Sequence, residues 1–278
     1  MIRILVDSSS DYPLEELAQK HIEEVPITIS IGEDNYIEGV NLERNDFYQL
    51  LEKSTVFPKT SQPSPQTFLD IFEDVKAKGD EIICILLSSK LSGTYQSAML
   101  AKEMADYDQI YLIDSLSATC NIKVMADYAC QLVQEGKSAQ KIVEAVEELK
   151  PRVKVIAMLD TLEYLYRGGR LSKTTAAIGE FANVKPVITL TEDGEIGILG
   201  KCLGKTKAMN FMMKHIEKLA IDERFPIYSI YTYGLENTEK FENKLINAHY
   251  QPNNRLQIGP TIGAHIGQGA FGLIYVIK

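Results

Sequence analysis

The sequence is poor in the residues that build metal sites and disulfide bonds. It contains four cysteines, Cys84, Cys120, Cys130 and Cys202, with no CxxC pair, and four histidines with no HExxH motif. Metal centres usually show clustered ligands at short spacings, so no metal is expected. The cysteines lie in apolar or helical contexts and are predicted to be buried free thiols, which fits a reducing cytoplasm.

Clustered positive charge and long apolar runs are also absent. The chain has 29 Lys and Arg against 38 Asp and Glu, a net charge of −9. This balance argues against nucleic acid and anionic membrane surfaces as partners. No apolar run approaches the length of a membrane span, and the N-terminus reaches Asp7 too soon for a signal peptide. A cytoplasmic protein without stable membrane insertion is expected.

Three familiar motifs are missing or out of place. No GxxxxGK[ST] sequence occurs, so ATP binding by this chain has no support. Residues 267–272 match GxGxxG, but a strand follows and the chain ends at Lys278, whereas a dinucleotide site opens a helix. No nicotinamide, flavin or other cofactor is therefore expected. The GxSxG sequence of α/β-hydrolases is missing as well.

The order of predicted elements indicates an α/β protein with two domains. In residues 1–150, strands at 2–6, 81–87 and 109–113 end in Asp-Ser or Ser-Ser pairs and precede helices, which is typical of a doubly wound, mainly parallel sheet. A further strand is predicted over 25–31. Lys150-Pro151 is the expected boundary, because proline disfavours helix in the residue before it.

Residues 151–278 are predicted to form an α+β domain with a mixed sheet. The turn EDGE joins two apolar runs between 184 and 203 and predicts an antiparallel hairpin. The chain is expected to close with a glycine-rich loop at 259–269 and a strand at 273–277.

The most informative stretch is residues 81–98, EIICILLSSKLSGTYQSA. A buried strand leads into a loop containing Ser88, Ser92, Gly93 and Thr94, and a helix follows. Ligands of open α/β sheets bind beyond the carboxyl ends of strands, where the first N–H groups of helices lack partners. This loop therefore suits a carboxylate or phosphate, and an ordinary N-cap loop is the alternative.

Two further features invite a functional reading. His265 lies among glycines that let the backbone approach a ligand closely, although an ordinary loop histidine fits the same pattern. Arg167, Arg170 and Lys173 flank Gly168-Gly169. They indicate either a docking or anion-contact point or a solvated helix end.

The same residues are also compatible with a catalytic site. Ser92, His265 and Asp7 or Asp114 would make a Ser-His-Asp triad, because triads are defined by geometry rather than by sequence order. A serine hydrolase or acyltransferase is thus the alternative function. A protein whose bound lipid acts only as a signal is a third.

Seven motifs, in order along the chain, together resemble the DegV family. They are DSSSDYP at 7–13, KTSQPSP at 59–65, SSKLSGTYQSA at 88–98, DSLSAT at 114–119, LEYLYRGGR at 162–170, VKPVITL at 184–190 and GAHIGQGAFG at 263–272. No single motif is decisive, but their order and separations are specific.

The resemblance implies a two-domain α/β protein that holds one long-chain fatty acid between its domains and does not itself catalyse a reaction. It would be the acyl-carrying subunit of a bacterial fatty-acid kinase. A separate kinase subunit would supply ATP and magnesium and convert the bound carboxylate to an acyl phosphate for phospholipid synthesis.

The resemblance also implies site residues. The carboxylate would be bound by Thr60 and Ser61, by Ser92 with Gly93, and by His265, and Arg170 would face the kinase.

Overall fold

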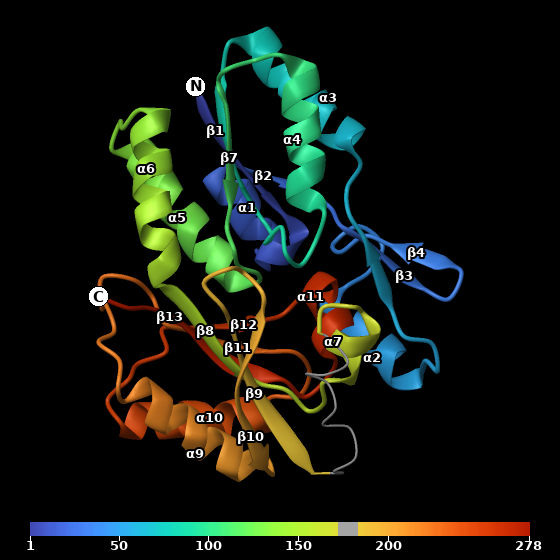
Figure 1. The fold of residues 1–278 in the computed structure, drawn as a ribbon, viewed down its shortest axis with the longest axis vertical. Coiled ribbons are helices and arrows are strands. Elements are labelled where there is room, and N and C mark those ends of the chain that lie inside the picture. The colour runs from blue at the N-terminus through green and yellow to red at the C-terminus, as the bar shows by residue number, and fades with distance from the viewer. Residues whose placement is uncertain (172–182) are drawn as a thin grey trace. The chain divides into compact units, whose positions relative to one another are not determined.

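The computed structural model describes residues 1–171 and 183–278 (Figure 1). Contacts group the chain into two units. Unit 1 comprises Met1–Thr28, Thr60–Pro151 and Glu192–Glu195, and unit 2 comprises Ile29–Lys59, Arg152–Thr191 and Ile196–Lys278. The chain therefore passes between the units more often than the one boundary expected near Pro151.

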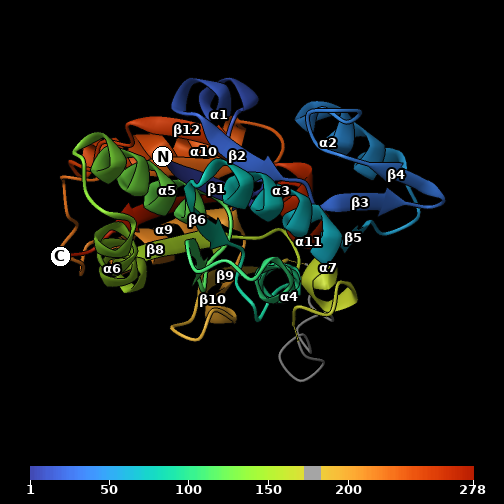
Figure 2. The same ribbon diagram turned by 90° about the horizontal axis from the view of Figure 1, so that it is seen from above.

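Unit 1 is built on a parallel sheet with the strand order β2-β1-β6-β7. Figures 1 and 2 show α3 and α4 on one side of this sheet and α5 and α6 on the other. The predicted parallel α/β architecture is thereby confirmed. The elements are β1 (Ile2–Asp7), α1 (Leu14–Lys20), β2 (Ile22–Val25), α3 (Pro65–Lys78), β6 (Glu81–Leu86), α4 (Thr94–Ala105), β7 (Ile110–Asp114), α5 (Cys120–Gln134) and α6 (Ala139–Leu149).

The core of unit 1 explains the apolar run in β6. Ile82, Cys84 and Leu86 pack with Phe68 and Phe72 of α3, whereas Ile83 and Ile85 alternate with them along the strand and are equally buried. A strand covered on both faces needs apolar residues at every position. Small residues of α4, among them Ala98, Ala101 and Ala105, complete this layer.

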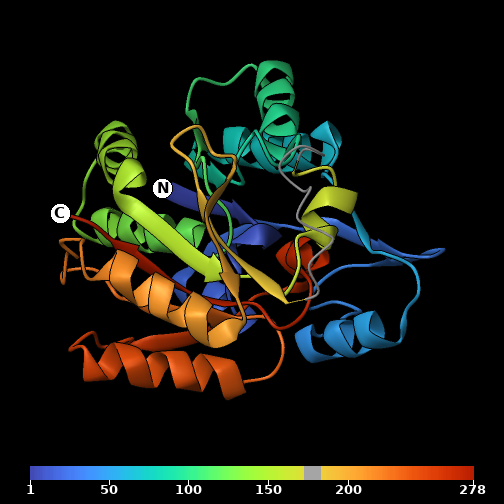
Figure 3. The same ribbon diagram turned by 60° about the horizontal axis from the view of Figure 1, so that its bottom comes forward.

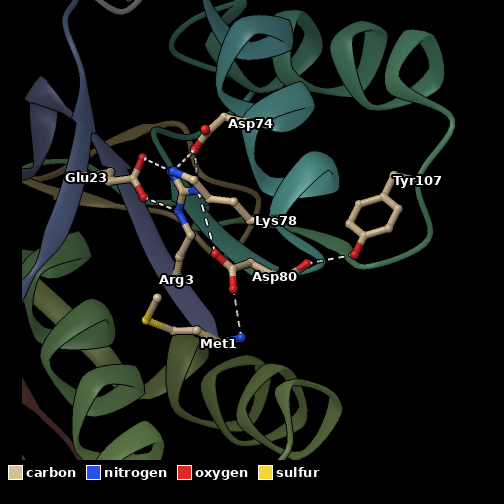
Figure 4. Close-up of polar contacts among 7 residues, drawn as sticks. All are labelled: Met1, Arg3, Glu23, Asp74, Lys78, Asp80 and Tyr107. Carbon is tan, nitrogen blue, oxygen red and sulfur yellow. Dashed lines mark hydrogen bonds and ion pairs between the residues drawn. The ribbon is translucent and has the colours of Figure 1, made fainter.

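An ion-pair network ties β1, β2 and α3 together (Figure 4). The Arg3 guanidinium donates to both carboxylate oxygens of Glu23, at 2.5 and 2.7 Å, and to Asp74 at 2.8 Å. Lys78 pairs with Asp74 at 2.9 Å, one helical turn along α3. The neighbouring carboxylates raise the pKa of Arg3, so this cation stays charged at any ordinary pH.

Unit 2 contains a six-stranded mixed sheet with the order β10-β9-β8-β13-β11-β12. Only the β11–β12 pair among these is parallel. Figure 3 shows α9 and α10 side by side, and both pack their apolar residues on the sheet. The elements are β8 (Val153–Met158), α7 (Glu163–Arg167), β9 (Val184–Leu190), β10 (Ile196–Leu203), α9 (Lys205–Ile216), β11 (Tyr228–Tyr231), α10 (Glu236–Asn247), β12 (Asn254–Gln257), α11 (Pro260–Ile266) and β13 (Phe271–Val276).

The segment 29–59 groups with unit 2 because of its own apolar core. Phe47, Tyr48 and Leu51 of α2 (Arg44–Lys53) are buried with Ile29 and with Ala264 of α11. A local sequence pattern shows that α2 has an apolar face but does not show which partner covers it. This is why the sequence reading placed the segment in the first domain.

Two predicted elements differ from the structure. The single strand expected over 25–31 is two strands, β2 and β3 (Thr28–Ile31), because Pro26 lies between them and lacks the N–H that a ladder needs. β3 pairs with β4 (Asp34–Tyr36) and belongs to a small sheet of order β4-β3-β5, with β5 at Lys59–Ser61.

The prediction of a glycine-rich loop at 259–269 was wrong, because Pro260–Ile266 form the helix α11. Pro260 stands in the first turn, where its fixed φ is compatible with a helix. Gly263 is a packing residue: a Cβ there would lie 2.5 Å from the Tyr48 hydroxyl. Gly267, with φ of 72°, ends the helix.

Among residues 1–171 and 183–278, no helix is both long and apolar enough to cross a membrane.

Candidate functional site

Buried polar residues gather at the carboxyl ends of the strands of unit 1. Asp7 ends β1 and accepts hydrogen bonds from the backbone N–H of Ser9, at 2.9 Å, and of Leu87, at 2.7 Å. Complete burial raises the pKa of Asp7 although these bonds oppose the shift. Asp114 ends β7 and accepts from the N–H groups of Ser89 and Leu116, both at 3.1 Å. Both aspartates therefore hold the strand-end loops in place.

The loop after β6 brings Ser92 to the start of α4. Ser92 Oγ lies 2.8 Å from the Thr94 hydroxyl and accepts from the Thr94 N–H at 3.3 Å. Gly93 is the N-cap residue of α4. The expected arrangement of a hydroxyl beside the first N–H groups of a helix is therefore present.

The TSQP segment meets this loop through Gln62. Its Nε2 donates to Ser97 Oγ of α4 at 3.0 Å. A Cβ on Gly93 would lie only 1.9 Å from Gln62 Oε1, so the carboxamide rests directly against Gly93. Gln62 follows Thr60 and Ser61, so the structure brings the two predicted hydroxyl motifs together within unit 1. Sequence reasoning missed Gln62, although it stands inside the motif.

His265 lies in the last turn of α11, in unit 2, and packs against the chain that follows α7. A Cβ on Gly168 would lie 2.4 Å from His265 Nδ1, and one on Gly267 would lie 2.6 Å from the Tyr164 ring. Gly168 and Gly267 thus allow α7 and α11 to approach closely. These two glycines are packing residues.

Burial and the nearby charge of Arg170 lower the pKa of His265 to about 4. The imidazole is therefore neutral at pH 7, with one nitrogen that donates a hydrogen bond and one that accepts. In a hydrolase triad the histidine is held by an aspartate, which stabilises its charged form. The charged group that shifts the pKa of His265 is instead a guanidinium, which disfavours an imidazolium.

Arg170 is half-buried, and its Nη1 donates to the Gly168 carbonyl at 2.5 Å. Burial lowers its pKa, though not enough to discharge a guanidinium. Arg167 differs, because it is exposed, pairs with Glu163 at 2.8 Å and lies 4.2 Å from the centre of the Phe57 ring. Within the predicted basic cluster, Arg170 is the residue whose charge acts on His265. Lys173 lies outside the described residues.

Each unit thus contributes groups that suit an anion. In unit 1 these are hydroxyls beside the N-terminus of α4, and in unit 2 they are a neutral imidazole and a guanidinium. Hydroxyl and imidazole donors, backbone N–H groups and arginine are the usual ligands of carboxylates and phosphates.

Comparison with known proteins identifies the family of the chain. A family model described as "uncharacterised protein, DegV family" matches residues 1–278. The chain belongs to the DegV family. A DegV domain-containing protein of Caldanaerobacter subterraneus is 37% identical over 284 residues, covering 100% of this chain and 99% of that protein. One from Clostridium acetobutylicum is 32% identical, with the same coverage.

Solved structures of fatty-acid-binding proteins share the fold over the full chain. DegV of Bacillus subtilis, described as a fatty acid binding protein, has a TM-score of 0.85 and 29% identity, covering 100% of this chain and 99% of that one. A stearic acid-binding protein from Eubacterium ventriosum has a TM-score of 0.88 and 27% identity, with the same coverage. Fatty acid binding is thus a property of characterised DegV proteins.

Proposed function

We propose that this chain binds one long-chain fatty acid and presents its carboxylate to a separate, ATP-binding kinase subunit. The acyl phosphate formed there would feed phospholipid synthesis. The binding step is supported by the polar groups in each unit that suit an anion, in a chain related over its whole length to solved fatty-acid-binding proteins. In this proposal Thr60, Ser61, Ser92, Gly93 and His265 bind the carboxylate.

The chemistry of these residues fits a carboxylate. Taking an ion out of water costs several kcal/mol unless it is well hydrogen-bonded. Three or four charge-assisted hydrogen bonds, at about 1.5 to 3 kcal/mol each, offset that cost. Burial of the acyl chain adds about 0.8 kcal/mol per CH₂ as an upper guide. Most of the affinity would therefore come from the tail, and the polar groups would fix the position of the head.

One feature of the sequence and one of the structure support the proposal that a separate kinase acts on the bound fatty acid. The chain contains no P-loop, so ATP would come with the partner. Ser61 and Gln62 are exposed, so the TSQP segment is accessible to a partner protein.

Replacement of Ser92 by Ala tests the binding step. The variant loses one hydroxyl at the carboxylate, so we expect roughly ten-fold weaker binding of stearic acid by titration calorimetry. The hydroxyl of Ser64, which caps α3, offers a matched control, and Ser64→Ala should bind like the wild type. Unchanged affinity in Ser92→Ala would count against the site. Labelling of Ser92 by a fluorophosphonate would favour the hydrolase alternative.

Arg170→Ala tests the presentation step. We expect slower acyl phosphate formation with the cognate kinase while stearic acid stays bound, because the proposed role of Arg170 is at the partner surface. An unaltered phosphorylation rate would remove that role. Equal losses of affinity and rate would instead assign Arg170 to the carboxylate, beside His265.

A further inference from the structure

Residues of α2 hold the helix that carries His265 at both of its ends. Before the helix, Tyr48 Oη donates to the Ile258 carbonyl at 2.7 Å and Arg44 Nη1 donates to the Gln257 carbonyl at 2.5 Å. After the helix, Gln268 Nε2 donates to the Tyr48 carbonyl at 2.5 Å. The seven residues of α11 are thus bracketed by contacts to one neighbouring segment.

The contact made by Arg44 includes a partly buried ion pair with Glu38. The side chain of Glu38 is only 11% exposed, and its Oε1 lies 2.7 Å from Arg44 Nε. A Cβ on Gly259 would lie 2.4 Å from both carboxylate oxygens of Glu38, so the carboxylate rests on the residue that precedes Pro260. Negative charge at that end of a helix is favourable, and Arg44 offsets the cost of burying it.

The middle of α11 is also packed tightly against α2. A Cβ on Gly263 would lie 2.5 Å from the Tyr48 hydroxyl and 2.9 Å from the Phe47 ring, and both aromatic side chains are fully buried. On the other side of the helix, His265 packs against Gly168. A shift of α11 along its axis would therefore move the imidazole away from Gly168 and Arg170.

We propose that Glu38 and Arg44 are positioning residues for His265, which act on the carboxylate site through α11. This inference rests on the proposed function, because it takes His265 to be a fatty-acid ligand. Nothing in the family motifs marks either residue, since both lie between the DSSSDYP and KTSQPSP segments. Their effect on binding is indirect: they hold the helix whose last turn presents the imidazole.

Two substitutions test the proposal by different routes. Glu38→Gln removes the charge and keeps the shape of the side chain. Gly259→Ala keeps both charges but places a methyl group where the carboxylate lies; its φ of −75° accepts alanine. We expect each variant to bind stearic acid roughly ten-fold more weakly, the equivalent of one lost charge-assisted hydrogen bond. The double variant should be no weaker than either single one, because both break the same contact.

The second readout is the pKa of His265 in the ligand-free protein, followed by NMR with labelled histidine. In the wild type it lies near 4, and in both variants it should move toward the ordinary value of about 6.5 as the helix loosens. A loss of global stability alone would leave the pKa of the native state unchanged. Asp222→Asn is the matched control, because it breaks an ion pair with Arg152 in the same unit.

The outcomes separate the two proposals. A wild-type affinity and a His265 pKa near 4 in folded Glu38→Gln and Gly259→Ala would overturn the positioning role. Weaker binding with an unchanged pKa would overturn it too, because the effect would then bypass His265. If the wild type itself fails to bind stearic acid, the proposed function is wrong, and the pKa comparison still decides whether Glu38 positions His265.

Discussion

His265 carries an imidazole that burial and Arg170 keep neutral at pH 7. Its place among glycines in the sequence fitted either a binding role or an ordinary loop histidine, and gave no information on its protonation state. That state depends on Arg170 and on packing against Gly168, which are contacts of the folded chain. The sequence thus offers His265 as a candidate, and the structure shows that its imidazole is neutral at pH 7.

The depressed pKa of His265 predicts a pH dependence of stability. The unfolded chain binds a proton on this side chain below about pH 6.5 and the folded protein only near pH 4. The free energy of unfolding should therefore fall as the pH drops through that window, by an amount on the order of 2 to 3 kcal/mol. Urea denaturation of ligand-free protein at pH 4.5 and 7 measures this. In His265→Asn the fall should be smaller, and an identical fall would contradict the assignment.

The contact between Gln62 and Gly93 predicts that the stability losses of substitutions at these two residues are not additive. Gly93→Ala would place a Cβ 1.9 Å from the Gln62 carboxamide, and that flexible group would swing away from Ser97. The variant should therefore lose the same hydrogen bond as Gln62→Ala, worth about 0.5 to 1.5 kcal/mol. Urea denaturation of the double variant should show no greater loss than either single variant. Gln66→Ala, which removes an exposed bond within α3, is the control, and additive losses would disprove the contact.

At the scale of elements, local patterns predicted most strands and helices. The apolar run at 81–87 predicted the strand β6, and the turn EDGE between two apolar runs predicted the antiparallel pair β9 and β10. The helix α11 was missed because its glycines resemble those of a loop. They are required instead by neighbours distant in sequence, Tyr48 and Phe47 for Gly263 and Tyr164 for Gly267.

Gly263→Ala tests the packing of α11 on α2. The added methyl group would meet two fully buried aromatic rings that cannot move aside. We expect a loss of about 1 to 3 kcal/mol in the free energy of unfolding. The loss should exceed that of Gly93→Ala, whose neighbour is a flexible side chain. Equal losses in the two variants, measured by urea denaturation, would show that the α2–α11 contact is looser than described.

At the scale of the whole molecule, the sequence predicted the α/β class, the parallel sheet and the family. Seven motifs spread along the chain made the family recognisable before any of them could be placed in space. Sequence patterns could not predict that residues 29–59 group with unit 2. It depends on which apolar surface covers α2, and that is a property of the assembled chain.

The central claim concerns a ligand, and mass spectrometry of the whole protein tests it most directly. The protein is purified, incubated with stearic acid and weighed under native and denaturing conditions. The account predicts a native mass higher by one fatty acid, which disappears on denaturation, and a released molecule identified as a fatty acid. A native mass equal to the denatured mass, both before and after the incubation, would contradict it.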